Sequence, residues 1–310
     1  MGREPPAIGV RPLLTKRGLT PLGVTVFEKE QILPLLTAAL KEDVGSRDIT
    51  SSALIPKEQL AKAEIVIRRE GVIAGLQLAE WVFGLTDPKI KFQPTVKDGQ
   101  RVYPDKAAAF LEGPARGILA GERVALNFLG HLSGIATLTR AFVEKVKGTS
   151  AKILETRKTT PGLRLLEKYA VRVGGGVNHR MGLYDGILIK DNHLRLAGGV
   201  EKAVALARSA GWKQTPIEVE VSSLQEFRQA LAAKADLILL DNMKLPETQE
   251  AVRLRNAVAR SKGGAKPLLE VSGGVTLEIA RLIALTGVDR ISVGALTHSA
   301  PALNISLEIL

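Results

Sequence analysis

Basic side chains gather between Leu154 and His193, in the stretch LETRKTTPGLRLLEKYAVRVGGGVNHRMGLYDGILIKDNH. The stretch holds seven Lys and Arg residues against four Asp and Glu, together with two of the chain's four His. Its cations follow short apolar runs or a Gly triplet, at Arg157, Lys158, His179, Arg180 and Lys190. Cations placed where strands end can clamp a small polyanion, and a basic surface loop is the alternative.

The composition is that of a globular protein. With 310 residues, of which 45% are hydrophobic and 24% charged, the chain can bury a core and form one large or two ordinary domains. It has no Cys, which excludes disulfides and thiolate chemistry and fits a cytoplasmic location. No apolar run is as long as a membrane-spanning helix, so we expect no membrane partner.

The net charge of +11 raises the question of a polyanionic partner. Nucleic acids and phosphorylated small molecules are both candidates. The basic residues are interleaved with acidic ones along the whole chain, and aromatics at 4% are few for a base-stacking surface. We therefore expect no nucleic-acid partner; salt-sensitive binding to generic DNA or RNA would support that alternative.

The first part of the chain predicts an extension followed by a mixed domain. Residues 1–26 are basic and contain several Pro but no apolar signal core, so we expect a loosely ordered extension. Residues 27–129 are interpreted as an N-terminal α+β sandwich domain: a helix over 27–40, a turn segment over 42–56, a strand pair over 63–76 that turns at Glu70-Gly71, and strands near 90–96 and 106–113. A helix over 120–146 follows, which we expect to be interrupted or kinked near Gly130 and Gly134.

A different rhythm begins after Gly148. Short apolar runs typical of strands alternate with amphipathic segments typical of helices, as in parallel α/β folds. The expected strands are 152–155, 186–189, 217–221, 237–240, 268–271 and 290–293, with a weaker candidate at 170–173; the expected helices are 161–170, 200–210, 223–233, 246–260 and 276–286. No G-x-G-x-x-G opens a helix after a strand, so we favour a closed or nearly closed barrel over 130–296 to a doubly wound sheet.

Polar or Gly-rich groups follow nearly every expected strand, where a barrel carries its reactive residues. These groups are Thr156-Arg157-Lys158, Lys190-Asp191-Asn192, Glu220, Asp241-Asn242, Ser272-Gly273-Gly274 and Val293-Gly294-Ala295. The glycine loops can turn backbone N–H groups toward a phosphate, with the helix that opens at Thr276 favouring an anion, or they can be plain turns. Glu220 and Asp241 could hold ribose hydroxyls or Mg²⁺, and Glu220 could instead form an ion pair with a Lys.

Metal ligation by histidine and nucleophilic attack by the protein are not indicated. The four His show no paired spacing, and the chain has no Ser-His-Asp arrangement and no G-x-S-x-G elbow. The expected task of the site is therefore to bind and orient two anionic substrates.

Several motifs in order, ETRKTTPGLR, GGGVNHRMGL, ILIKDNH, IEVEV, LILLDN, EVSGG and VGALTHS, resemble the quinolinate phosphoribosyltransferase family. The upstream EDVGSRDIT and GERVALNFLGHLSGIAT match as well, so the resemblance covers about residues 28–310. It implies an N-terminal α+β sandwich, joined by the tail 297–310, and an open or incomplete α/β barrel of the type II phosphoribosyltransferase kind. It also implies a reaction: quinolinate and 5-phosphoribosyl 1-pyrophosphate (PRPP), with Mg²⁺, give nicotinate mononucleotide, pyrophosphate and CO₂ in de novo NAD biosynthesis.

The resemblance further implies a role for each matching residue. The quinolinate carboxylates would be held by Arg157, His179, Arg180 and Lys190, and by Arg123 from the partner subunit of a homodimer or higher even oligomer. On the PRPP side the catalytic residues would be Lys158, Glu220 and Asp241, with Mg²⁺ near the two acids. The 5-phosphate would lie near residues 272–274 and 293–295. Arg164 and Lys168 would be surface or secondary charges on the following helix.

Two positions depart from the family pattern, Val271 before SGG and Gly130-His131 in the long helix. Neither changes a residue with an implied role. A related enzyme that accepts nicotinate, which lacks the second carboxylate, is the close alternative. The number of cations in the site favours a dicarboxylate.

Overall fold

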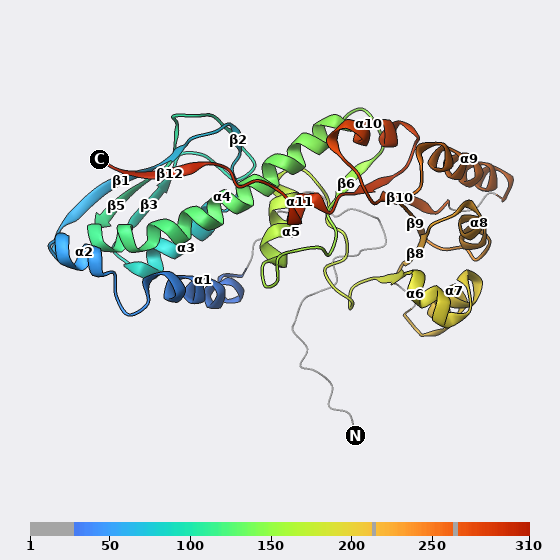
Figure 1. Cartoon of the computed structure of the whole chain (residues 1–310), viewed down its shortest axis with the longest axis horizontal. Coiled ribbons are helices and arrows are strands. Elements are labelled where there is room, and N and C mark those ends of the chain that lie inside the picture. The colour runs from blue at the N-terminus through green and yellow to red at the C-terminus, as the bar shows by residue number, and fades with distance from the viewer. Residues whose placement is uncertain (1–27, 213–214, 263–265) are drawn as a thin grey trace, which may run out of the picture. The chain divides into compact units, whose positions relative to one another are not determined.

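The computed structural model describes residues 28–212, 215–262 and 266–310 (Figure 1). The expected N-terminal extension therefore lies outside the described residues. The described residues form two compact units, one with residues 28–179 and 272–310, the other within residues 180–271. In the part of the chain that the structure describes, none of the helices is long and apolar enough to cross a membrane.

The N-terminal part of the first unit is an antiparallel sheet covered by helices (Figure 1). Its elements are α1 (Lys29–Val44), α2 (Ile49–Leu54), β1 (Leu60–Ile67), β2 (Gly71–Val72), α3 (Leu76–Thr86), β3 (Lys91–Pro94), β4 (Arg101–Val102), β5 (Ala107–Pro114), α4 (Ala115–Lys145) and β12 (Ile305–Ile309). The strand order is β12-β1-β5-β3, so the last strand of the chain pairs with the first. Alternation along β5 buries Leu111 against the helices and leaves Phe110 on the open face.

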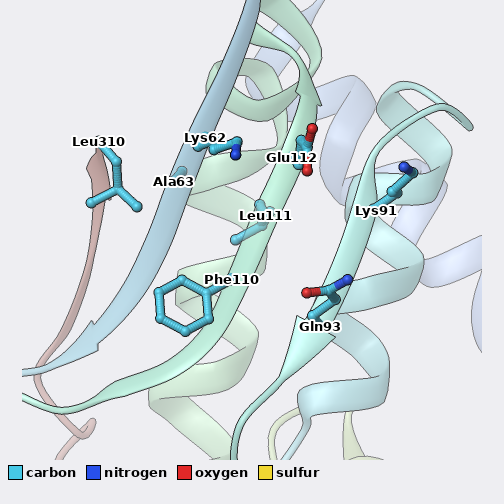
Figure 2. Close-up of a pocket in the computed structure, with 8 residues that line it drawn as sticks. All are labelled: Lys62, Ala63, Lys91, Gln93, Phe110, Leu111, Glu112 and Leu310. Carbon is cyan, nitrogen blue, oxygen red and sulfur yellow. The ribbon is translucent and has the colours of Figure 1, made fainter.

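The open face of this sheet carries a pocket that is separate from the predicted site. Its lining comes from β1, β3, β5 and the C-terminus: Lys62, Ala63, Lys91, Gln93, Phe110, Leu111, Glu112 and Leu310 (Figure 2). None of the predicted site residues lines this pocket. The pocket is therefore no candidate for the chemistry that the sequence predicts.

Two local expectations for this part were wrong. The segment 63–76 is not one strand pair, because β1 pairs with β5 and β12 while the short β2 pairs with β4. Its end instead begins α3, whose first backbone N–H groups donate to Asp98. The expected turn after Gly45 contains α2, which Asp48 caps by accepting from the Ser51 N–H at 2.9 Å.

The long helix α4 is continuous, so the expected interruption near its glycines was wrong. Both glycines instead let the chain cross the helix closely. A Cβ on Gly134 would lie 2.1 Å from the Pro301 carbonyl oxygen, and one on Gly130 would lie 3.0 Å from that of Leu303. The Leu303 N–H donates to the Gly130 carbonyl at 2.9 Å. The predicted domain boundary at 129/130 falls within α4 and stays a prediction.

The remaining elements alternate parallel strands with helices. The strands are β6 (Lys152–Leu154), β7 (Ile187–Ile189), β8 (Ile217–Val221), β9 (Leu237–Asp241), β10 (Leu268–Ser272) and β11 (Arg290–Ser292). The helices are α5 (Arg164–Val173), α6 (Asp191–Ala197), α7 (Val200–Ser209), α8 (Leu224–Ala232), α9 (Leu245–Lys262), α10 (Leu277–Leu285) and α11 (Ala295–His298). The weak strand candidate at 170–173 was wrong: it is the last turn of α5, which ends where the Gly174 N–H donates to Ala170.

The strand order favours a barrel over a doubly wound sheet. In the second unit the order is β10-β9-β8-β7, so each strand pairs with its neighbour in sequence. In the first unit β6 and β11, the first and last of the parallel series, pair directly with Ser292 opposite Leu154. A series of βα units pairs its last strand with its first when it curls into a barrel, whereas a doubly wound sheet places its first strand internally. Beyond β6 lies only an isolated bridge from Leu154 to Val177 in the described residues, as expected of an incomplete barrel.

Candidate active site

In the first unit, the ends of β6 and β11 bring Lys158 beside a glycine loop. The Val293 N–H donates to the Leu154 carbonyl at 2.8 Å, which extends the strand pairing to the loops. The Thr297 hydroxyl donates to the Lys158 carbonyl at 2.8 Å. A Cβ added to Gly294 would lie 3.4 Å from Lys158 Cδ, so the lysine stem runs alongside this loop. An exposed ammonium next to backbone N–H groups is suited to a phosphate or diphosphate.

The loop after β6 is fixed at several points. The Lys158 N–H donates to the Thr156 hydroxyl at 3.0 Å, and Arg164 Nε donates to the Thr159 hydroxyl at 2.9 Å. The Thr160 N–H donates to Glu167 Oε2 at 3.1 Å. Arg157 lies half-buried within this held segment. The loop therefore presents its cations from an ordered backbone, which lowers the entropy lost when an anion binds.

Buried charges beside this loop were not expected from the sequence. Glu155 and Lys168 form an ion pair with side chains 0% and 1% exposed. Lys168 was expected to be a surface or secondary charge, and the surface position was wrong, because α5 turns its side chain inward together with Val171. Arg164 is half-buried and bonds to Thr159, so it is a loop-holding group rather than a free surface charge.

His179 is held by this buried pair through its backbone. Its N–H donates to Glu155 Oε1 at 3.1 Å, and its carbonyl accepts from Lys168 Nζ at 2.9 Å. Asn178 donates to Glu155 Oε2 at 3.1 Å and to the Lys168 carbonyl at 2.8 Å. The first unit thus ties His179 to the start of the loop that carries Arg157 and Lys158.

The glycine loop after β10 has the backbone that only glycine adopts easily. Gly273 and Gly274 have φ of 93° and 60°, which is left-handed. The following helix α10 begins at Leu277, but its own Glu278 carboxylate already lies near its start, where the Thr276 hydroxyl lowers the pKa of Glu278. The helix N-terminus therefore has a carboxylate of its own, and a plain turn remains an alternative for these glycines.

In the second unit, Lys190, Glu220 and Asp241 lie at the ends of neighbouring strands. Ile189 is opposite Val219, so Lys190 and Glu220 follow side by side, and Lys190 Nζ lies 2.5 Å from Glu220 Oε2. Glu220 is opposite Leu239, two residues before Asp241, so the two carboxylates project from one face of the sheet. The ion pair considered for Glu220 is present, and its partner is itself a predicted site cation.

The carboxylates of this group fit a hard cation by their chemistry. Glu220 and Asp241 offer oxygen ligands, which Mg²⁺ prefers, and Asp241 Oδ2 also accepts from Asn242 at 3.1 Å. The Lys190 ammonium beside Glu220 already supplies positive charge there. The donor set suits a cation that arrives with an anionic substrate and shares its ligands.

Arg180 belongs to the second unit and is placed by a tight loop. Its Nη1 donates to the Gly186 carbonyl at 2.9 Å. The loop between them is closed by Asp185, which accepts from the Met181 and Gly182 N–H groups at 2.7 and 2.9 Å. Arg180 is half-buried, so it can offer its guanidinium in a restricted orientation.

Arg123 and His131 lie on α4. Arg123 is exposed in the first half of the helix. His131 departs from the family pattern noted in the sequence, and its Nε2 lies 2.9 Å from Glu167 Oε1. Because Glu167 also holds the Thr160 N–H, His131 is joined to the loop after β6.

The structure thus places the predicted residues in two sets. The first unit brings Thr156, Arg157 and Lys158 together with Val293, Gly294 and Ala295, and ties His179 to them; it also carries Arg123 and the loop Ser272, Gly273 and Gly274. The second unit brings together Lys190, Glu220 and Asp241, and carries Arg180. The cations can bind carboxylates and phosphates, and the two acids can bind hydroxyls or stabilise a developing cation.

Sequence reasoning missed the buried acids Glu155, Glu167, Glu218 and Glu270, and misjudged Lys168. One signal was available for Glu218 and Glu270, since each is an acid inside an apolar strand run. A charge in such a position needs a buried partner.

Two family models match the chain in succession. The model described as quinolinate phosphoribosyl transferase, N-terminal domain, matches residues 48–133. The model described as quinolinate phosphoribosyl transferase, C-terminal domain, matches residues 135–308.

Similar proteins of known name cover nearly the whole chain. The probable nicotinate-nucleotide pyrophosphorylase (carboxylating) of Bacillus subtilis strain 168 is 43% identical over 279 residues, 90% of this chain and 93% of that protein. The nicotinate-nucleotide pyrophosphorylase (carboxylating) of Mycobacterium leprae is 46% identical over 276 residues, 87% and 94% of the two chains. The crystal structure of NadC from Streptococcus pyogenes is 42% identical with a TM-score of 0.85, and covers 92% of this chain and 99% of that one.

Proposed function

The chain belongs to the quinolinate phosphoribosyltransferase family, and from this premise we propose how its residues perform the reaction. The protein is a decarboxylating quinolinate phosphoribosyltransferase. It transfers the phosphoribosyl group of PRPP to quinolinate and forms nicotinate mononucleotide, pyrophosphate and CO₂, a step of de novo NAD biosynthesis. The fold is an N-terminal α+β sandwich with an incomplete α/β barrel.

Quinolinate is bound through its two carboxylates by Arg157, His179, Arg180 and Lys190. Support comes from their placement: Arg157 lies on the held loop after β6, and Arg180 is oriented by its bond to Gly186. Lys190 lies at the end of β7. Guanidinium and ammonium groups that are fixed before the substrate arrives bind a dicarboxylate with less loss of entropy than mobile groups would.

PRPP is bound by Lys158, Glu220 and Asp241, the residues that we assign to catalysis. The exposed ammonium of Lys158 runs along the Gly294 loop and neutralises the diphosphate. The two carboxylates hold the ribose hydroxyls. The 5-phosphate binds at the loops 272–274 and 293–295, where Gly273 and Gly274 are left-handed. The Val293 N–H does not contribute, because it donates to the Leu154 carbonyl. Mg²⁺, which would neutralise diphosphate charge, would be held by Glu220 and Asp241 together with PRPP.

The chemistry needs no general base, because the pyridine nitrogen attacks with its own lone pair. The bond from that nitrogen to the anomeric carbon forms as the bond from the anomeric carbon to the diphosphate oxygen breaks. Glu220 and Asp241 stabilise the positive charge that develops on the ribosyl group, and Lys158 stabilises the negative charge that leaves with pyrophosphate. The clamp cations aim the nitrogen at the anomeric carbon, which supplies most of the remaining rate by positioning.

Decarboxylation follows from the same bond. Once the ring nitrogen is quaternary, the carboxylate on the adjacent carbon leaves as CO₂, and the electron pair left on that carbon is stabilised by the positive nitrogen. A proton from water then completes the ring. Arg157 and Arg180 hold the carboxylate that stays on the ring, and so retain the ring during this step.

The enzyme acts as a homodimer, or a higher even oligomer, in which Arg123 completes the quinolinate site of the partner subunit. The exposure of Arg123 on α4 supports this assignment. The cytoplasmic location expected from the sequence stays part of the proposal.

The observation that carries the residue assignment is the succession of charged and glycine groups at the ends of the parallel strands. The test is turnover of purified protein with quinolinate, PRPP and Mg²⁺, following pyrophosphate and CO₂ together. We expect equal amounts of both and no reaction after chelation of Mg²⁺. Absence of turnover, or pyrophosphate release without CO₂, would overturn the proposal.

A further inference from the structure

Glu155 and Lys168 form a buried ion pair that the proposed reaction does not use. Both side chains are almost fully buried, at 0% and 1% exposure. Glu155 accepts from Lys168 Nζ, from the His179 N–H at 3.1 Å and from Asn178 Nδ2 at 3.1 Å. Lys168 also donates to the His179 carbonyl at 2.9 Å. Every one of these contacts lies within the first unit.

Such a pair contributes little net free energy to the stability of a fold. Removing two charges from water costs several kcal/mol each, and the attraction between them roughly offsets that cost. Apolar residues of similar volume would often serve stability equally well. Both members of the pair also bond to the backbone of one residue. Glu155 accepts from the His179 N–H, and Lys168 donates to the His179 carbonyl.

Because of its position in the chain, the pair connects His179 to the segment that carries Arg157. Glu155 is followed directly by Thr156, Arg157 and Lys158, so its carboxylate joins the start of that segment to His179. Lys168 lies on α5, whose Glu167 holds the same loop at Thr160. The next residue after His179 is Arg180. Within the first unit, His179 and the segment that carries Arg157 are therefore fixed to each other by one buried pair.

We propose that Glu155 and Lys168 are positioning residues for quinolinate: they set the His179 backbone relative to the Arg157 segment and so fix the spacing of the carboxylate clamp. This rests on the proposed roles of Arg157 and His179 in binding quinolinate. Lys158 depends less on the pair, because Thr297 holds its carbonyl independently. The pair therefore governs the affinity for quinolinate and leaves the affinity for PRPP nearly unchanged.

The experiment compares Lys168→Met, Glu155→Gln and the double variant with the unmodified enzyme. Titration calorimetry measures the dissociation constants for quinolinate and for PRPP, and thermal unfolding measures stability. Leu166→Ala is the matched control, since Leu166 is also on α5 and 1% exposed but has an apolar side chain. This control should lower the melting temperature and leave both dissociation constants unchanged.

Each single variant leaves one buried charge without its partner, so both should melt at lower temperature than the double variant. The double variant removes both charges and should regain stability. Its dissociation constant for quinolinate should stay raised, on the order of tenfold to a hundredfold, because the bond from Lys168 to the His179 carbonyl is lost. A pair with only a structural role would instead regain quinolinate affinity together with stability.

Tight quinolinate binding by the double variant, at the level of the unmodified enzyme, would overturn the positioning role. So would an equal loss of affinity for PRPP. Failure of the unmodified enzyme to bind quinolinate is a separate result, which would overturn the proposed function and this role with it.

Discussion

Within four residues after β6, exposure changes in the order that the chemistry requires. Glu155 is fully buried, Arg157 is half-buried and Lys158 is exposed. A buried acid anchors the segment, a half-buried guanidinium can be desolvated around a carboxylate, and an exposed ammonium can meet a large diphosphate. The same segment thus provides Glu155 as a buried anchor, Arg157 as a cation suited to a carboxylate, and Lys158 as a cation suited to a diphosphate.

At the residue scale, Arg157→Ala should lose most of the affinity for quinolinate. When a quinolinate carboxylate is buried without its Arg partner, the binding free energy becomes less favourable by about 2–5 kcal/mol. The dissociation constant for quinolinate should therefore rise on the order of thirtyfold or more. Calorimetric titration with quinolinate measures this change. Arg195→Ala, which removes an exposed cation of α6, is the control and should bind normally. Equal affinity of the Arg157→Ala variant and the unmodified enzyme would refute the assignment.

Residue types at strand ends could be predicted from the sequence, because a short apolar run shows where a strand stops. The burial of Lys168 could not, because it depends on Glu155 and His179, which lie 13 and 11 residues away and meet it only after β6 and α5 have packed. An ion pair between Glu220 and a lysine was predicted as an alternative, but the sequence did not show that the lysine is Lys190. Pairing of strands β7 and β8 decides which lysine meets the acid.

At the element scale, Gly130 and Gly134 of α4 allow residues 301–303, which lead to β12, to lie close against the helix. Gly134→Ala should destabilise the protein by about 1–3 kcal/mol, since the new methyl group overlaps the Pro301 carbonyl. Gly84→Ala in α3 is the matched control. No atom lies within 4 Å of a Cβ at that position, so the better helix propensity of Ala should stabilise by up to about 1 kcal/mol. Urea unfolding of both variants measures the difference, and equal changes would contradict the crossing.

Asp98 connects Tyr169 of α5 with the start of α3. The Tyr169 hydroxyl donates to Asp98, which also accepts from the Gly75 N–H at 2.7 Å. Burial, and then the Asp98 charge, raise the pKa of Tyr169 above its ordinary value near 10. A raised pKa keeps the phenol neutral in the folded state, so its stabilisation is complete below pH 10 and is lost as the pH rises above 10.

Tyr169→Phe should therefore cost about 1–2 kcal/mol near neutral pH. Above about pH 10 the gap between the variant and the unmodified protein should narrow, since Phe cannot ionise in the unfolded chain. Urea unfolding at several pH values measures both effects. Tyr103→Phe, at an exposed position, should show neither. Parallel stability curves for Tyr169→Phe and the unmodified protein would show that the bond does not carry this linkage.

Most strands and the longer helices of the C-terminal half could be predicted within two or three residues, because their apolar periodicity is strong. The short elements could not. α2 has six residues and looks like a polar turn in sequence, and AVRV alternates for only four residues, too few to separate a strand from the end of α5. The residues themselves do not show that β1 pairs with β12, which lies far along the chain, although the family resemblance placed the tail 297–310 with the N-terminal domain.

At the scale of the whole molecule, the proposed dimer predicts complementation between two inactive proteins. Arg123→Ala and Arg180→Ala subunits that exchange partners should form hybrids with one intact site, in which Arg180 comes from one subunit and Arg123 from the other. Random pairing should restore roughly a quarter of the activity. Steady-state assay of the mixture after subunit exchange measures the recovery.

The control mixes Arg157→Ala with Arg180→Ala. Both residues are assigned to the same subunit's site, so no hybrid contains an intact site and activity should stay low. Recovery in this control, or none in the first mixture despite verified exchange, would contradict the role of Arg123 across the interface.

The most direct test of the account is the selectivity for a dicarboxylate. The ratio of kcat/KM for quinolinate to that for nicotinate should be on the order of a hundredfold or more, because nicotinate leaves part of the cationic clamp without a partner. Competition of the two acids in one assay with PRPP and Mg²⁺ gives this ratio directly. Comparable values of kcat/KM for both acids would contradict the account, since a clamp that reads two carboxylates cannot ignore the loss of one.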